Sequence, residues 1–270
     1  MIRPVDTAAA GRTNDQLHSR LEPVAHVGYA VSGLLHLLIG YLAVRVALGQ
    51  GGGSADQSGA LAQIAGTPGG AVVLWVATVA LAALGLWQLT DAVARGRSPS
   101  GEATDVAKAV GKGVVYLALA FTTLTFARGG SSSSDQQATD VTAQLVQSGP
   151  GRVLVAVIGL GLLGVGGHHV YKGVKDRFLR DLGALPRSGA KAALWSGRIG
   201  YPAKGVALGV LGVLFVLAAV QADPQEAGGL DTALRTLAEA PFGTVLLVLV
   251  GLGFAVFGVY SFFRARYGRL

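Results

Sequence analysis

The sequence predicts an all-α, polytopic integral membrane protein with six transmembrane helices, which form three parallel two-helix repeats with pseudo-threefold symmetry. Three observations predict this class. First, 51% of the 270 residues are hydrophobic and only 14% are charged, whereas about a quarter of the residues in a soluble domain are charged. Second, the apolar residues gather in six long runs. Third, glycines recur at matching positions in three consecutive parts of the chain.

Each apolar run is long enough to cross a bilayer as a helix. At about 1.5 Å per residue, roughly 20 residues span the ~30 Å of hydrocarbon. A transmembrane β-strand would need only about 9 to 11 residues and would alternate polar with apolar side chains, and these runs do not alternate. The six runs are 24–48, 71–94, 109–127, 153–171, 202–220 and 244–263.

The spacing of glycines reveals the repeat. When Gly33, Gly113 and Gly205 are aligned, a second set of glycines follows 37 or 38 residues later, and a third set follows 15 residues after that. Every unit then contains two helices, so all three units insert in the same sense, and their symmetry axis is expected along the membrane normal. The second set is Gly70, Gly151 and Gly243, and the third is Gly85, Gly166 and Gly258.

The repeats and their linkers divide the chain into six segments. A cytoplasmic N-terminal tail precedes the first repeat, a short cytoplasmic linker follows it, and a longer basic linker precedes the last repeat. The expected bounds are 1–22 for the tail, 23–97, 107–176 and 198–267 for the repeats, and 98–106 and 177–197 for the linkers.

The distribution of basic residues predicts that both termini are cytoplasmic. With the tail and residues 95–112, 172–204 and 264–270 on one side, that side holds 18 of the 22 Lys and Arg residues. Basic short loops stay in the cytoplasm, so we expect a multi-pass protein of the bacterial cytoplasmic (plasma) membrane. No aromatic-interleaved basic module occurs in the sequence, so nucleic acid is not an expected partner.

The three helix entries read "GYAVSG", "GKGVVY" and "GYPAKGV", and a turn like "PFG" precedes the second helix of each unit. This pattern resembles the domain of unknown function family 1206, bacterial membrane proteins with three tandem two-helix repeats, over nearly the whole chain from Pro23 to Tyr267. The resemblance implies the architecture and no activity. The second unit departs from the pattern, because Lys108 and Ala109 replace its Gly-Tyr pair.

The glycines at these helix entries are interpreted as packing residues, and the lysines as residues that reach the membrane surface. Gly33, Gly113 and Gly205 are expected to let helices approach closely, as small residues do in membranes. Lys112 and Lys204 are expected to extend toward the headgroups. A phosphate-binding loop is excluded because Lys204 precedes the second glycine of its motif instead of following it.

Charged residues near the membrane-spanning runs suggest an ion pair between repeats. Asp91, Lys172 and Arg264 occupy equivalent positions near the inner ends of the second helices. We expect Asp91 to pair with Lys172 or Arg264, or with Arg95 four residues further along its own helix.

The histidines raise the question of a haem or metal site. His36 aligns with Tyr116 and Leu208, and His168 aligns with Trp87 and Tyr260, so packing is the favoured role for His36, His168 and His169. A proton or pH role remains open. The chain contains no cysteine, which excludes thiolate metal sites and disulfides. We expect no metal, no cofactor and no catalytic residue.

The basic side of the protein is expected to contact anionic lipid. Arg198 and Lys204 bracket "IGYPA", with Tyr201 at headgroup depth, and diffuse lipid contact from the basic bias alone is the alternative. The candidate headgroup ligands are Lys112, Lys172, Arg198, Tyr201, Lys204 and Arg264.

Two functions follow from these patterns. The favoured one is a non-enzymatic membrane scaffold or accessory subunit that binds another membrane protein or lipid. The alternative is a channel or carrier for a small solute or lipid along the pseudo-threefold axis, where Ser32, Thr122, Thr123 and Thr125 would line the path.

Overall fold

The computed structural model describes residues 7–50, 53–96 and 102–269, with side chains from residue 26 onward except those of 27 and 94. The first six residues of the predicted tail and residues 98–101 of the predicted linker lie outside these ranges. The described residues form helices and no strand, apart from one isolated antiparallel bridge between Leu182 and Gly268.

Within the described ranges, six helices are long and apolar enough to cross a membrane. They are α1 (Thr7–Ala47), α3 (Gly70–Gly96), α4 (Ala103–Ala127), α6 (Gly149–Val174), α7 (Arg187–Gln221) and α9 (Gly243–Tyr267). Shorter helices lie between them: α2 (Gln57–Ala65), α5 (Ser134–Val146), η1 (Arg177–Asp181), η2 (Pro224–Glu226) and α8 (Leu230–Glu239). The predicted all-α class with six membrane helices is thus confirmed.

Three of the long helices begin six or more residues before their apolar runs. α1 starts at Thr7, α4 at Ala103 and α7 at Arg187, so parts of the expected tail and of both expected linkers are helical. Hydropathy does not detect such extensions, because a helix outside the hydrocarbon needs good helix formers and not apolar ones. The alanines of "RSGAKAALWSGR" are of this kind.

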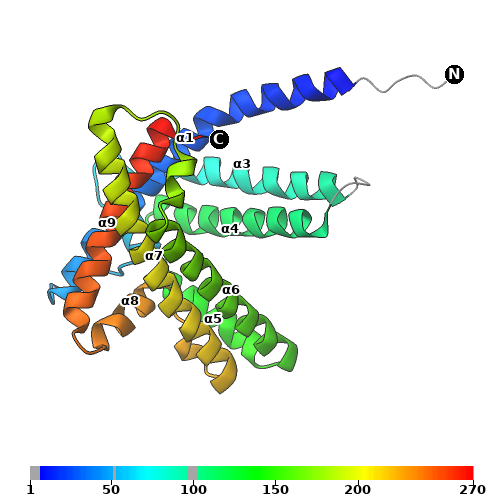
Figure 1. Ribbon diagram of the computed structural model, residues 1–270. Helices are drawn as coiled ribbons and strands as arrows, with labels where there is room; N and C mark the ends of the chain where they lie inside the picture. Colours follow the sequence, from blue (N-terminus) through cyan, green and yellow to red (C-terminus); the bar gives the residue numbers. More distant parts are fainter. Residues whose placement is uncertain (1–6, 51–52, 97–101, 270) are drawn as a thin grey trace. The chain divides into compact units, whose positions relative to one another are not determined.

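The chain forms two compact units. The first combines Met1–Ala55 with Asp135–Leu270, and the second is Asp56–Ser134. In the first unit α1 packs along α9, α6 packs along α7, and α8 lies against α7 and α9 (Figure 1). In the second unit α3 packs along α4, and α2 contacts both.

The helix pairs with the most extensive packing join neighbouring repeats. α3 with α4 and α6 with α7 each combine the second helix of one repeat with the first helix of the next, and α9 with α1 combines the last helix with the first in the same way. The pairing of α9 with α1 is what a closed arrangement of three repeats requires, and it is consistent with the predicted pseudo-threefold symmetry.

Equivalent glycines lie at the contact of each pair. A Cβ atom added to Gly33 would lie 3.0 Å from the carbonyl oxygen of Gly258, one on Gly113 would lie 3.2 Å from that of Gly85, and one on Gly205 would lie 2.6 Å from that of Gly166. Without Cβ atoms the two backbones of each pair approach closely, which allows extensive packing inside a bilayer.

A second small-residue contact follows seven residues along two of these pairs. Gly40 lies against Gly251 between α1 and α9, and Gly212 lies against Gly159 between α7 and α6. A spacing of seven residues keeps the contacts on one side of each helix, as in a coiled-coil seam.

An aspartate lies at or next to the start of two of the loop helices. Asp56 caps α2 by accepting a hydrogen bond from the backbone N–H of Gly59 at 2.9 Å. Asp231, in the first turn of α8, accepts from the backbone N–H of Ala55 at 2.7 Å and from Arg235 Nε at 2.7 Å. In the first unit, the Asp231 carboxylate therefore fixes α8 to the chain that follows α1.

Candidate functional site

The polar side chains of the first unit concentrate where α6 and α9 end and α7 begins. Three features lie there: a buried aromatic cluster with one carboxylate beside it, an exposed basic surface, and a lysine in contact with a histidine.

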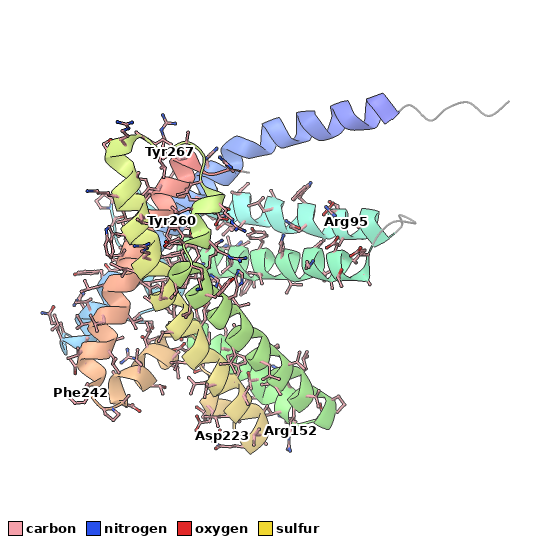
Figure 2. The ribbon with its side chains drawn as sticks, viewed as in Figure 1. Arg95, Arg152, Asp223, Phe242, Tyr260 and Tyr267 are labelled. Atoms are coloured by element: carbon pink, nitrogen blue, oxygen red, sulfur yellow. The ribbon has the colours of Figure 1, made fainter. Side chains whose placement is uncertain are left out.

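The basic linker is anchored by Phe178, a residue of η1. Its side chain is fully buried and packs on Tyr201, Tyr260 and the backbone of Gly197, where any Cβ would collide with the Phe178 ring. The Tyr260 hydroxyl donates to the Phe178 carbonyl oxygen at 2.8 Å. Figure 2 shows Tyr260 between Tyr267 and Phe242, which mark the two ends of α9.

Asp181 pairs with two basic side chains beside this cluster. Its Oδ2 accepts from Lys172 Nζ at 2.6 Å and lies 3.6 Å from Arg264 NH1. The Lys172 ammonium also lies 5.1 Å from the centre of the Tyr201 ring. Because Lys172 is on α6 and Arg264 on α9, Asp181 links two repeats.

The ion pair between repeats is therefore made by a carboxylate that the sequence did not point to. Within the first unit, Lys172 and Arg264 share the carboxylate of Asp181. Asp91, in the second unit, accepts from Arg95 Nε at 2.7 Å, which is the expected pairing within one helix. A pair of Asp91 with Lys172 or Arg264 would join the two units and stays a prediction.

Tyr201 was expected to be a headgroup ligand, and its side chain is buried among aromatic rings. It is 3% exposed and contacts Phe178, Phe257 and Tyr260, with ring centres 5.1 to 5.6 Å away. The linker folds back over α7, so Phe178 covers the face of the helix that would otherwise meet water or lipid.

Arg198 is held by a second carboxylate of the linker. Its Nε and NH2 donate to the two oxygens of Asp176 at 2.7 and 2.6 Å, a bidentate pair. Asp176 has a positive φ of 54°, which aspartate tolerates better than most residues. The hydrogen bond from Arg198 holds the pKa of Asp176 below its ordinary value.

Both linker carboxylates are thus occupied by partners on the transmembrane helices. Seven exposed basic side chains at the same end of this unit have no described carboxylate within ion-pair distance. We call these residues the basic cap. They are Lys175, Arg177, Arg180, Arg187, Lys191, Arg266 and Arg269.

Backbone contacts hold the parts of the basic cap together. Gly183 N–H donates to the Tyr267 carbonyl oxygen at 2.6 Å, and Arg269 N–H donates to the Asp181 carbonyl oxygen at 2.9 Å. These bonds join the end of η1 to the end of α9, so cations that are far apart in the sequence share one surface.

The remaining predicted ligands lie in two different surroundings. Lys112, in the second unit, is exposed. Lys204 is half-buried, and its Nζ lies 3.1 Å from His36 Nε2 and 4.5 Å from the centre of the Phe257 ring. Lys204 was expected to extend toward the headgroups, and it contacts a histidine on another helix instead.

The three candidate histidines differ in their contacts. His36 lies beside the rings of Phe254 and Phe257 and makes the contact with Lys204, so it does more than pack. His169 Nδ1 lies 2.8 Å from the Val165 carbonyl oxygen, and its ring is 5.6 Å from that of Tyr201. His168 is exposed.

The threonines considered for a solute path use their hydroxyls within α4. Thr122, Thr123 and Thr125 each donate to the carbonyl oxygen four residues earlier, at 3.1, 2.7 and 3.1 Å. The Ser32 hydroxyl lies 3.4 Å from His36 Nδ1.

Phe178, Asp181 and Gly197 were not among the predicted site residues. A signal for two of them is present in "KDRFLRDL", where one phenylalanine and two aspartates interrupt a basic linker. An aromatic residue in a polar segment indicates that the segment docks on something apolar.

Comparison with known proteins finds the same three repeats along the chain. The family model described as Domain of Unknown Function (DUF1206) matches three times, at residues 27–95, 107–176 and 199–268. The chain is also 25% identical over 246 residues to the uncharacterized protein YxxB of Bacillus subtilis (strain 168), an alignment that covers 89% of each chain. No solved structure matches. The three matches cover most of the sequence, and the chain therefore belongs to the DUF1206 family of uncharacterised proteins, as a three-repeat member with six apolar helices.

Proposed function

We propose that the protein is a non-enzymatic scaffold of the bacterial cytoplasmic membrane that binds anionic lipid through its basic cap, with both termini in the cytoplasm. One observation carries the proposal: the linker carboxylates are occupied by Arg198, Lys172 and Arg264, while seven exposed cations at the same end of the unit have no described carboxylate beside them.

The energetics favour lipid as the partner of these cations. Each Lys or Arg close to an anionic membrane surface contributes about 1 kcal/mol of attraction, which falls off within a Debye length. Seven such residues on one surface supply more attraction than isolated cations would. The backbone bonds between the end of η1 and the end of α9 help to keep them together at little further cost in entropy.

An exposed tryptophan supports a position of the basic cap among the lipid headgroups. The Trp195 side chain is 58% exposed, and Arg198 Cζ lies 5.7 Å from the centre of its ring. Tryptophan is enriched where the membrane meets water, so Trp195 at the start of α7 suits a position among the headgroups beside the basic cap.

The test measures lipid selection by the full chain in nanodiscs of mixed phosphatidylglycerol and phosphatidylcholine. We expect the protein to retain phosphatidylglycerol preferentially after partial delipidation, and the triple variant Lys175→Gln, Arg177→Gln, Arg180→Gln to lose most of this preference. Added salt should weaken the preference of the wild type.

A matched control removes the same charge elsewhere. Lys108, Lys112 and Arg128 are exposed basic residues outside the basic cap, and their replacement by glutamine should reduce the preference much less than the cap variant does. Equal phosphatidylglycerol retention by the cap variant and the wild type would refute the proposal.

A further inference from the structure

The hydrogen bonds of His36 show which of its two ring nitrogens carries the hydrogen. His36 Nδ1 lies 2.7 Å from the Ser32 carbonyl oxygen, which accepts only, so Nδ1 must carry the hydrogen and donate. Nε2 of the neutral ring is then an acceptor, and the Lys204 ammonium donates to it at 3.1 Å. This assignment follows from the hydrogen-bond network, and it places one positive charge on the pair.

That charge lies beside the apolar runs of α1 and α7. Lys204 is the third residue of the run 202–220, and His36 lies in the middle of the run 24–48. In the repeat alignment Lys204 matches Ser32, yet its side chain reaches His36, one turn further along α1. A charge placed in an apolar layer is costly, and its position usually serves a function.

The described surroundings provide no negative charge for Lys204. The ionisable groups that face this region are His169 and Lys172 of α6, Tyr201 of α7, Tyr260 and Arg264 of α9, and Asp181 at the end of η1. The one carboxylate among them, Asp181, is engaged by Lys172 and Arg264. The other groups are basic or neutral, so the region carries an excess of positive charge.

The Lys204 ammonium also keeps unused donors. It has three N–H bonds, and its one hydrogen bond to a described residue is to His36; the Phe257 ring covers another side at 4.5 Å. Both Lys204 and His36 are only half-buried, so the pair is not sealed inside the protein.

We propose that Lys204, supported by His36, binds a single oxyanion, a carboxylate or a phosphate. His36 orients the ammonium by accepting one N–H, and the remaining N–H bonds donate to the oxyanion. The ligand is either the acidic group of a membrane amphiphile or a free anion, since both offer the same acceptor chemistry. The site is separate from the basic cap and does not depend on it.

Thermal unfolding of the purified full-length chain in neutral detergent tests the proposal with three probes: inorganic phosphate, oleate and phosphatidylglycerol. The variants are Lys204→Met and, as a matched control, Lys112→Met, which removes the equivalent lysine of the second repeat. We expect at least one probe to bind the wild type and Lys112→Met at least tenfold more tightly than Lys204→Met, as the loss of a charged hydrogen bond implies.

The probes separate the two sources of ligand, and a second measurement needs no variant. Stabilisation by phosphate alone identifies a soluble anion, and stabilisation by oleate or phosphatidylglycerol alone identifies an amphiphile. In the wild type, the bound probe should slow acetylation of Lys204 by acetic anhydride about tenfold relative to Lys112 in the same molecule. Equal stabilisation of wild type and Lys204→Met by every probe, or unchanged reactivity of Lys204 with all three probes, would overturn the proposal. Lipid lost from the basic cap would change neither comparison, so this site and the proposed function fail separately.

Discussion

Gly33 and Gly258 lie 225 positions apart in the sequence and face each other across the contact between α1 and α9. Their counterparts in the other repeats, Gly113 with Gly85 and Gly205 with Gly166, make the same contact. The unit of packing is therefore not the unit of sequence repetition. Each helix pair takes its two members from different repeats, and the first and last membrane helices complete the set.

Close packing at these glycines predicts a position-specific effect of alanine. The Cβ of Gly205→Ala would lie 2.6 Å from the Gly166 carbonyl oxygen, so the helices must separate, at a cost of about 1–3 kcal/mol. Gly209 on the same helix has nothing within 4 Å of an added Cβ, and Gly209→Ala should be neutral or slightly stabilising. Thermal unfolding of both variants in detergent provides the measurement; equal stability of the two would contradict the close contact.

Removal of the shared carboxylate predicts a loss of stability. In Asp181→Asn, Lys172 and Arg264 lose their common acceptor charge in a half-buried site, and we expect unfolding to become easier by about 2 kcal/mol. Asp105→Asn, which breaks an exposed pair with Lys108 on one helix, serves as the control and should have little effect. If the Asp181 variant proves as stable as this control, Asp181 does not hold the linker in place.

The pair of Asp176 and Arg198 predicts a dependence on pH. Arg198 lowers the pKa of Asp176 in the folded state, so the contribution of the pair is complete above the ordinary pKa of aspartate, about 3.9, and is lost as the pH falls through the lowered value. Arg198→Gln should therefore be less stable than the wild type at pH 6, and the difference should shrink below pH 4. A difference that grows as the pH falls would show that the carboxylate is not stabilised as its anion.

The sequence predicts the helices, the repeat and the glycines at the helix contacts, because each of these leaves a local or periodic pattern. Hydropathy reports length and burial in lipid, and the offsets between Gly33, Gly70 and Gly85 recur in the later repeats. Which helices pair most closely is not visible in such a pattern, since the same glycines could serve contacts within a repeat.

The polar site was less predictable, because its partners are distant in the sequence. Asp181 lies in a linker that reads as basic and water-exposed, and only the burial of Phe178 brings it between Lys172 and Arg264. Lys204 was expected to follow the usual preference of lysine for the headgroups. His36, 168 positions earlier in the sequence, provides an acceptor on the apolar side instead.

The central claim is that the basic cap faces the anionic cytoplasmic leaflet, and the side of the membrane on which it lies tests this directly. The chain has no cysteine, so a single introduced cysteine reports its own location to a membrane-impermeant maleimide. Arg180→Cys lies in the basic cap, and Gln225→Cys lies in the exposed loop between α7 and α8. In intact cells we expect the reagent to label Gln225→Cys and to reach Arg180→Cys only after permeabilisation; labelling of Arg180→Cys in intact cells would place the basic cap outside and contradict the claim.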